Sequence, residues 1–175
     1  KLEPGTARDM FEGYLPHSGQ EPKLGPRPRS APLLARIGDA VRGKAIFFAQ
    51  ESKCVTCHKL GDQGTPLGPD LAKIASKRTR DELLDSLLQP SRTIEPAFAA
   101  YQVLDHAGRT HVGLLVSRDA KTLVLRDAQN KELRFAATDI DRITPSRVSL
   151  MPDGLLSSFT AQQAADLLAY LETLR

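Results

Sequence analysis

The sequence predicts a mainly α-helical fold with a small antiparallel β insertion. Two segments with capping signals, at 79–90 and 160–174, have apolar residues at helical spacing, and a third helix is expected at about 39–50. Between the last two helices, over residues 98–143, the apolar residues instead recur with a period of two. At 175 residues the chain can bury a core without disulfides. We therefore expect helices around one core, with a sheet inserted before the last helix.

Residues 1–36 are rich in proline and glycine and show no sustained periodicity. This composition predicts a linker or an extended arm. The main domain is then expected to span 37–175, with 97–145 as an inserted β subdomain. Because the arm has few apolar side chains to bury, we expect it to contribute little to stability, although it could instead lie as an extended strap on the surface.

The first helix of the main domain is predicted from its start signal and its apolar face. Asp39 is a suitable N-cap, and Val41, Ala45 and Phe48 share one helical face, which predicts a helix at about 39–50. The Gly-rich stretch after residue 60 predicts a loop, followed by a short helical turn at 71–75.

Two later helices begin with a capping box, in which an N-cap threonine is followed three residues later by Glu or Gln. Thr79 with Glu82 starts the helix that runs to Pro90, and Thr160 with Gln163 starts the C-terminal helix. Leucines repeat at three and four positions in both segments. Both are therefore predicted to be amphipathic helices.

The inserted sheet is predicted from alternating apolar and polar residues separated by polar turns, between Pro96 and Pro145. We expect the alternation to face inward, as at Val112, Leu114 and Val116. His106 and His111 flank one turn and could bind a metal as a pair, but a solvated hairpin end explains them equally well, and no third ligand is nearby.

The most informative motif contains the only two cysteines of the chain, in the run Cys54-Val55-Thr56-Cys57-His58. Two thiols at this spacing can each add to one vinyl group of the same haem, and the adjacent imidazole then reaches the iron. A redox dithiol would favour a βαβ context, and a zinc site would need a distant fourth ligand. A disulfide between the two would close only a tiny loop. The motif therefore predicts covalent haem attachment, with His58 as an iron ligand.

Charge and hydropathy exclude two classes of partner. The formal net charge is +3, but residues 1–37 hold six Lys and Arg against four Asp and Glu, which leaves 18 basic against 17 acidic residues in the rest. A nearly neutral body without a basic stripe argues against nucleic acid. No apolar run approaches the roughly 18 residues needed to cross a bilayer, so no membrane span is expected in this segment.

Four stretches together carry a family resemblance. Residues 38–47 (GDAVRGKAIF), the Cys54 to His58 motif, residues 68–71 (GPDL) and residues 149–155 (SLMPDGL) resemble class I cytochrome c. The resemblance is closer to the haem-binding domain that planctomycetes and verrucomicrobia append to large, often dehydrogenase-like, secreted proteins. It covers about 37–175 and implies cytochrome c-like helices around one haem.

The resemblance also implies specific roles. Met151 would be the distal iron ligand, the Pro69 carbonyl would accept the second ring N–H of His58, and Leu71 would form a wall of the haem pocket. Gly43 and Phe47 would interlock with Tyr170. Met151 is also the only methionine outside the arm, and it stands in a loop before Pro152 rather than on an apolar helical face.

The implied function is single-electron transfer by a periplasmic or otherwise extracytoplasmic module that is not itself an enzyme. Its partner would be a redox protein or a fused dehydrogenase domain. One alternative is a haem-based enzyme or small-ligand sensor with an open or labile distal site, and another is a docking module with a merely structural haem. One of three arginines, Arg78, Arg80 or Arg92, could pair with a haem propionate. Met10 and His17 lie in the arm and are poor candidates for iron ligands.

Overall fold

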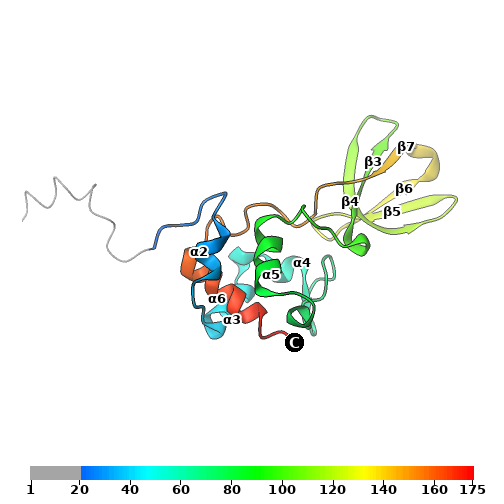
Figure 1. Ribbon diagram of the computed structural model, residues 1–175. Coiled ribbons are helices and arrows are strands. Elements are labelled where there is room, and N and C mark those ends of the chain that lie inside the picture. Colours follow the sequence, from blue (N-terminus) through cyan, green and yellow to red (C-terminus); the bar gives the residue numbers. More distant parts are fainter. Residues whose placement is uncertain (1–20) are drawn as a thin grey trace, which may run out of the picture.

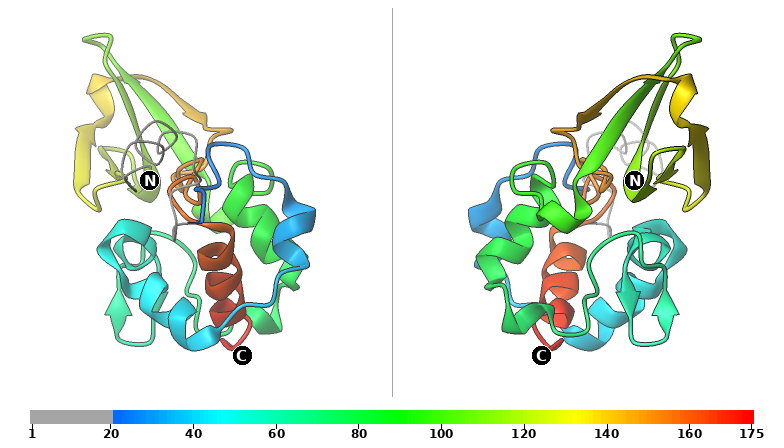
Figure 2. Two further views of the ribbon diagram at one scale, coloured as in Figure 1. Left: turned by 90° about the vertical axis from the view of Figure 1, so that its left-hand side faces the viewer. Right: turned by 90° about the vertical axis from the view of Figure 1, so that its right-hand side faces the viewer.

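The computed structural model describes residues 21–175, which form a helical part and a β-sheet that projects from it (Figures 1 and 2). The helices are α2 (Ser30–Leu34), α3 (Ala40–Phe48), α4 (Cys54–Cys57), α5 (Arg80–Leu88) and α6 (Ala161–Leu171). Short 3-10 turns lie at Gln50–Ser52, Ile74–Ser76, Pro96–Phe98 and Ala137–Asp139, and β1 (Lys59–Leu60) pairs with β2 (Gln63–Gly64). Of the described residues, 32% are helical and 24% lie in strands. The fold is therefore mixed, with more strand than the mainly α prediction implied.

Three predicted helices begin at their predicted caps. The Asp39 carboxylate accepts hydrogen bonds from the amides of Val41 and Arg42 at the start of α3. Both capping boxes are formed, by Thr79 before α5 and by Thr160 before α6. Each cap satisfies backbone donors that a helix start leaves unpaired, which stabilises a helix by about 1 kcal/mol. These start signals are local, which is why the sequence predicts them well.

Helices α3 and α6 pack in very close contact, as the family resemblance implied. A Cβ added to Gly43 would lie 1.9 Å from the carbonyl oxygen of Asp166 and 2.8 Å from the Tyr170 Cβ. The rings of Phe47 and Tyr170 have their centroids 5.5 Å apart. Only glycine permits this approach of the two backbones.

A buried carboxylate closes the same interface. The Asp166 side chain is only 3% exposed and accepts hydrogen bonds from Arg42 Nε (2.7 Å) and from the Asp39 amide (2.7 Å). Burial, the largest influence, raises its pKa, but the bonds from Arg42, Asp39 and Gln162 outweigh burial and lower it. The carboxylate therefore stays charged and ties the start of α3 to α6.

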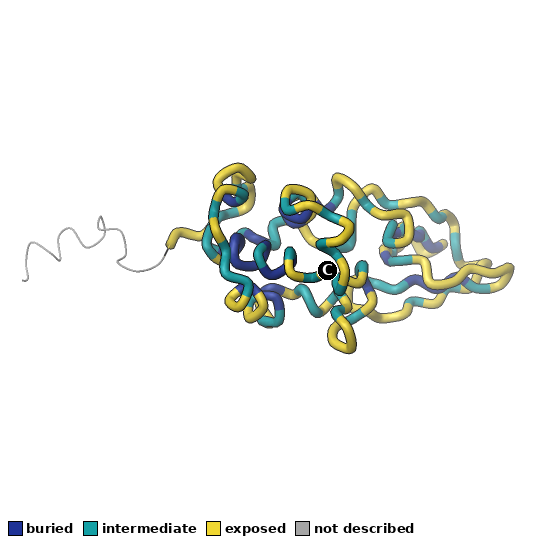
Figure 3. Tube along the Cα trace, turned by 60° about the horizontal axis from the view of Figure 1, so that its bottom comes forward, coloured by how far each residue is buried: buried dark blue, intermediate teal, exposed yellow. Residues whose placement is uncertain are grey.

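The predicted antiparallel sheet is present, with five strands in the order β6-β5-β4-β3-β7. They are β3 (Ala100–Asp105), β4 (Thr110–Arg118), β5 (Thr122–Arg126), β6 (Glu132–Ala136) and β7 (Ile140–Pro145). The first four form a meander, and β7 returns to pair with β3. Buried residues form two separate groups, one among the helices and one in the sheet (Figure 3). The sheet therefore has a small core of its own.

The prediction that the β4 alternation faces inward is wrong. Val103 in the sheet core pairs with His111, so the face of β4 that carries His111 points to that core. Val112 is 37% exposed and Val116 is 43% exposed. A register shift between Leu115 and Ser117 further disturbs the alternation.

Residues 21–36, the described part of the segment 1–36 predicted as a linker or an extended arm, pack against the helical part, whereas residues 1–20 lie outside the described part of the chain. Leu33 on α2 is only 1% exposed and belongs to the helical core. The Leu24 amide donates to the Phe159 carbonyl (2.8 Å) and the Gly25 amide to the Ser157 carbonyl (3.0 Å). This segment is therefore a packed strap along the chain that leads into α6, although its Pro-rich composition is typical of linkers.

Candidate functional site

The two cysteines lie at the ends of the four-residue helix α4, so their side chains emerge on the same side of one helical turn. The His58 amide donates to the Cys54 carbonyl at 2.8 Å and closes this turn. Lys53, directly before Cys54, has the left-handed conformation (φ 58°) that non-glycine residues rarely adopt. Both thiols are half-buried and not joined in a disulfide. Burial raises the pKa of both thiols.

His58 is held by the loop that follows the motif. Its Nδ1 lies 2.9 Å from the Pro69 carbonyl oxygen, which can only accept, so Nδ1 carries the proton. A Cβ on Gly68 would lie 2.7 Å from His58 Cε1, so a glycine is needed where the loop passes the ring. Burial lowers the pKa of His58, partly opposed by the Pro69 bond. The ring is thus neutral with Nε2 free to coordinate a metal.

The remaining predicted pocket residues gather around the helical core. Leu71 is positioned by a bond from its amide to the Lys59 carbonyl (3.0 Å). Leu71, Cys54 and Met151 are all half-buried and pack against the same core cluster, to which α5 and α6 contribute. The structure therefore brings the attachment segment and the methionine to one core, although 93 positions separate His58 from Met151 in the chain.

Hydrogen bonds at the base of the inserted sheet hold the Met151 segment beside the end of α5. The amide of Ser149 donates to Ser91 Oγ at 3.1 Å, and the amide of Met151 donates to Ser149 Oγ at 3.1 Å. The chain thus leaves the helical part just after α5 and returns to the same place after the sheet. The insertion adds sequence between the two candidate ligands without separating α5 from the methionine segment.

The donor set fits a haem better than the alternatives. The helical turn presents both thiols on one side, the Gly68 backbone fits against the imidazole, and one imidazole nitrogen is oriented while the other stays free. No group of three or more His, Cys, Asp or Glu side chains among residues 21–175 is arranged to hold a metal ion, which argues against a zinc site. The short helix α4 is also not part of a βαβ unit, as a thioredoxin-like dithiol would require.

The two hairpin histidines do not form a pair. His111 Nε2 lies 3.1 Å from Asp105 Oδ2, and its ring is 4.8 Å from that of Phe135, whereas His106 is exposed. Asp105 is nearly buried, and its pKa falls to about 2, chiefly because it accepts the Arg109 backbone amide and also because of His111 and the Arg109 side chain. The sequence analysis did not predict that Asp105 binds Arg109 and His111. The tight turn at 106–109, which brings these residues close to Asp105, is the sequence feature that could have indicated it.

The three candidate propionate arginines all pair with carboxylates of the protein. Arg78 contacts Glu95 and Arg80 contacts Glu172, while Arg92 bonds Asp85 at 2.7 Å. The two arm residues considered as ligands, Met10 and His17, lie outside the described residues. The sequence analysis also did not predict the role of Asp166, although a single acidic residue within the apolar stripe of α6 could have indicated it. No sequence feature indicates that Ser91 and Ser149 form a pair.

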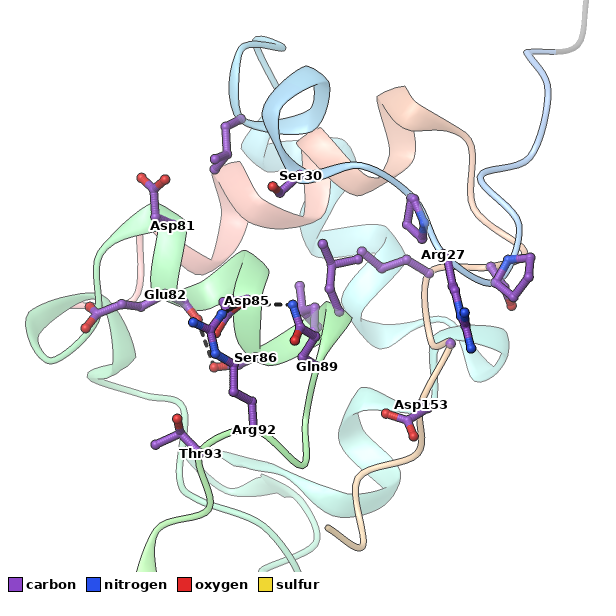
Figure 4. Close-up of a pocket in the computed structure, with 18 of the residues that line it drawn as sticks. Arg27, Ser30, Asp81, Glu82, Asp85, Ser86, Gln89, Arg92, Thr93 and Asp153 are labelled. Atoms are coloured by element: carbon purple, nitrogen blue, oxygen red, sulfur yellow. Dashed lines mark hydrogen bonds and ion pairs between the residues drawn. The ribbon is translucent and has the colours of Figure 1, made fainter. Parts of the chain in front are cut away.

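A groove of about 1150 Å³ lies between the segment 26–34, α5 and the residues after Met151 (Figure 4). Its lining mixes charges of both signs, including the Asp85 and Arg92 pair. None of the four candidate haem residues, which are Cys54, Cys57, His58 and Met151, lines it. The groove is therefore separate from the candidate haem site.

A paired dithiol on one helical turn, with an oriented imidazole beside it in a small helical domain, defines the class of c-type haem-binding domains. Comparison with known families agrees with this class. Residues 40–107 match the family model of cytochrome c, which places a cytochrome c domain in this part of the chain. The match includes α3, the Cys54 to His58 motif and Pro69, and it ends before Met151. No curated protein matches the chain.

This match agrees with the predicted cofactor. A cytochrome c domain with these two cysteines is consistent with covalently bound haem c and with haem-dependent electron transport. Proteins of this family are typically electron carriers rather than enzymes. In the described part of the chain, no helix is long and apolar enough to cross a membrane.

Proposed function

We propose that this domain transfers single electrons through one haem c that is attached at Cys54 and Cys57 and coordinated by His58 and Met151. The observation that carries the proposal is the bond between His58 Nδ1 and the Pro69 carbonyl oxygen, because it fixes the tautomer and the orientation a metal-binding imidazole needs. The half-buried Met151 beside the same core supports the distal assignment.

Each residue of the site has a separable role. A bound haem supplies a metal centre that changes its charge by one electron. The two thiols anchor it to α4, the Pro69 carbonyl fixes the orientation and tautomer of the His58 imidazole, and burial favours its neutral form. A methionine thioether is a soft, neutral ligand that favours ferrous iron, so Met151 raises the reduction potential. Leu71 excludes water from the pocket wall.

We further propose that the domain is of the planctomycete and verrucomicrobial type and works outside the cytoplasm. Its partner is then a redox protein or a fused dehydrogenase domain. The support is the combination of the residue 149–155 motif with a five-stranded sheet inserted directly before it.

The distal ligand is tested by substituting Met151→Ala in the holoprotein. The far-red thioether-to-iron absorption band should disappear, and added imidazole or cyanide should bind. The reduction potential should fall, and every 59 mV of that fall corresponds to a tenfold change in the equilibrium constant for one-electron reduction. Met10→Ala is the matched control, because Met10 is the only other methionine, and it should leave the band unchanged.

A Met151→Ala protein that kept its six-coordinate spectrum and its potential would contradict the proposal. An unsubstituted protein that already lacks the band and binds imidazole would instead favour the ligand sensor or the haem enzyme. Attachment is tested separately with Cys54→Ala and Cys57→Ala, since the double variant should lose its haem on a denaturing gel.

A further inference from the structure

The segment 149–157, here called the methionine loop, is the direct continuation of the inserted sheet. Strand β7 ends at Pro145, and the Ser146 amide still donates to the Ala100 carbonyl of β3 at 2.8 Å. Only two residues then lie between that last sheet bond and Ser149. Figure 1 shows this part of the chain running from the sheet back to the helices. A displacement of the sheet would therefore reach Met151 unless something holds the loop.

Two serines provide that hold. Ser91, just after α5, accepts the amide of Ser149 across 58 positions of sequence, and Ser149 in turn accepts the amide of Met151. Both bonds are 3.1 Å long and both serines are half-buried. The bonds form a continuous chain from the end of α5 to the backbone of the candidate iron ligand.

We propose that Ser91 and Ser149 are positioning residues for the distal ligand. They attach the backbone of Met151 to α5 and so separate it from movements of the sheet. This inference rests on the proposed His58/Met151 coordination. The fraction of molecules with the loop displaced would then determine how readily another ligand competes for the iron position that Met151 would occupy.

The two bonds should be functionally distinguishable. Ser149→Ala removes the acceptor of the Met151 amide itself, whereas Ser91→Ala removes the anchor one step further away. Loss of one hydrogen bond of this kind should raise the apparent affinity for imidazole by about two- to tenfold. The effect of the double variant should be smaller than the product of the two, because the bonds act in series.

The experiment measures imidazole affinity, the far-red band and the potential of the holoprotein, together with its melting temperature. In Ser91→Ala and Ser149→Ala we expect tighter imidazole binding, a weaker band and a lower potential at temperatures far below melting. Ser91→Thr and Ser149→Thr keep the hydroxyl and should restore the unsubstituted values. A merely structural role would lower the melting temperature without changing imidazole affinity.

Ser86→Ala is the matched control. Its hydroxyl is also hydrogen-bonded, to the Glu82 carbonyl on the same helix, but has no link to the methionine loop. Imidazole affinities that stay unchanged in Ser91→Ala and Ser149→Ala, while the unsubstituted protein shows the far-red band, would overturn this inference alone. Absence of the band from the unsubstituted protein would overturn both this inference and the distal assignment.

Discussion

The substitution Gly43→Ala tests the packing of α3 against α6 because two effects of opposite sign compete. In an ordinary helix interior, replacing glycine by alanine stabilises by about 1 kcal/mol. Here the new Cβ would meet the Asp166 carbonyl oxygen at 1.9 Å, where about 3.5 Å is a comfortable separation. The obstacle is helix backbone and cannot rotate away, so the helices must move apart by more than about 1 Å.

The magnitude follows from what that movement disrupts. Overpacking costs about 1–3 kcal/mol, and weakening the contact of Phe47 with Tyr170 adds about 0.5–1.5 kcal/mol. After subtraction of the helix propensity gain, we expect a net loss of about 1–3 kcal/mol. For a chain of this size, this corresponds to a melting temperature lower by about 3–10 °C.

Thermal unfolding of the holoprotein, followed by circular dichroism, measures the effect. Lys44→Ala, an exposed neighbour on α3, is the control and should change the stability by less than about 0.5 kcal/mol. A Gly43→Ala protein as stable as the unsubstituted one, or more stable, would refute the reasoning, because helix propensity would then outweigh the backbone contact.

Three further substitutions test other parts of the fold. Leu33→Ala should lower the free energy of unfolding by about 2–5 kcal/mol in denaturant titrations, since Leu33 is fully buried, and a change below about 1 kcal/mol would instead support the prediction that this segment contributes little to stability. Replacing His106 and His111 together by Gln should leave the haem absorption spectrum unchanged, and a shifted oxidised spectrum would move the distal ligand into the sheet. The pKa of Asp105 falls from its ordinary 3.8 to about 2, so its charge stabilises the sheet above about pH 4, and this contribution disappears as the pH falls from about 4 to 2. Asp105→Asn should therefore flatten the loss of stability in this pH range, and an unchanged acid unfolding curve would contradict the role of Asp105.

The parts of the fold predicted well from sequence are those determined by local interactions. The caps at Asp39, Thr79 and Thr160 satisfy donors within three residues of themselves, and all three helices begin there. The Cys54 to His58 motif lies on one helical turn for the same reason. Strand positions were also predictable, because a period of two reflects only the local pleat.

The failures involve interactions between elements that the pattern within one element does not reveal. Which face of β4 points inward depends on its register with β3 and on a bulge, neither of which the alternation of Val112 and Val116 reveals. The Pro- and Gly-rich composition of the arm does not reveal that Leu33 packs in the helical core. The bond between Ser91 and Ser149 joins two polar residues of unremarkable type and could only be found from the fold.

The interface between α3 and α6 has a consequence for the order in which the protein matures. Arg42 and Asp166 are 124 positions apart, so α3 has no partner to pack against until nearly all of the described chain has been made. The cysteine motif lies just after α3 and is synthesised long before that partner. On the growing chain, Cys54 and Cys57 therefore emerge before the core can close, so both thiols are more accessible at that stage than in the folded structure, where they are half-buried.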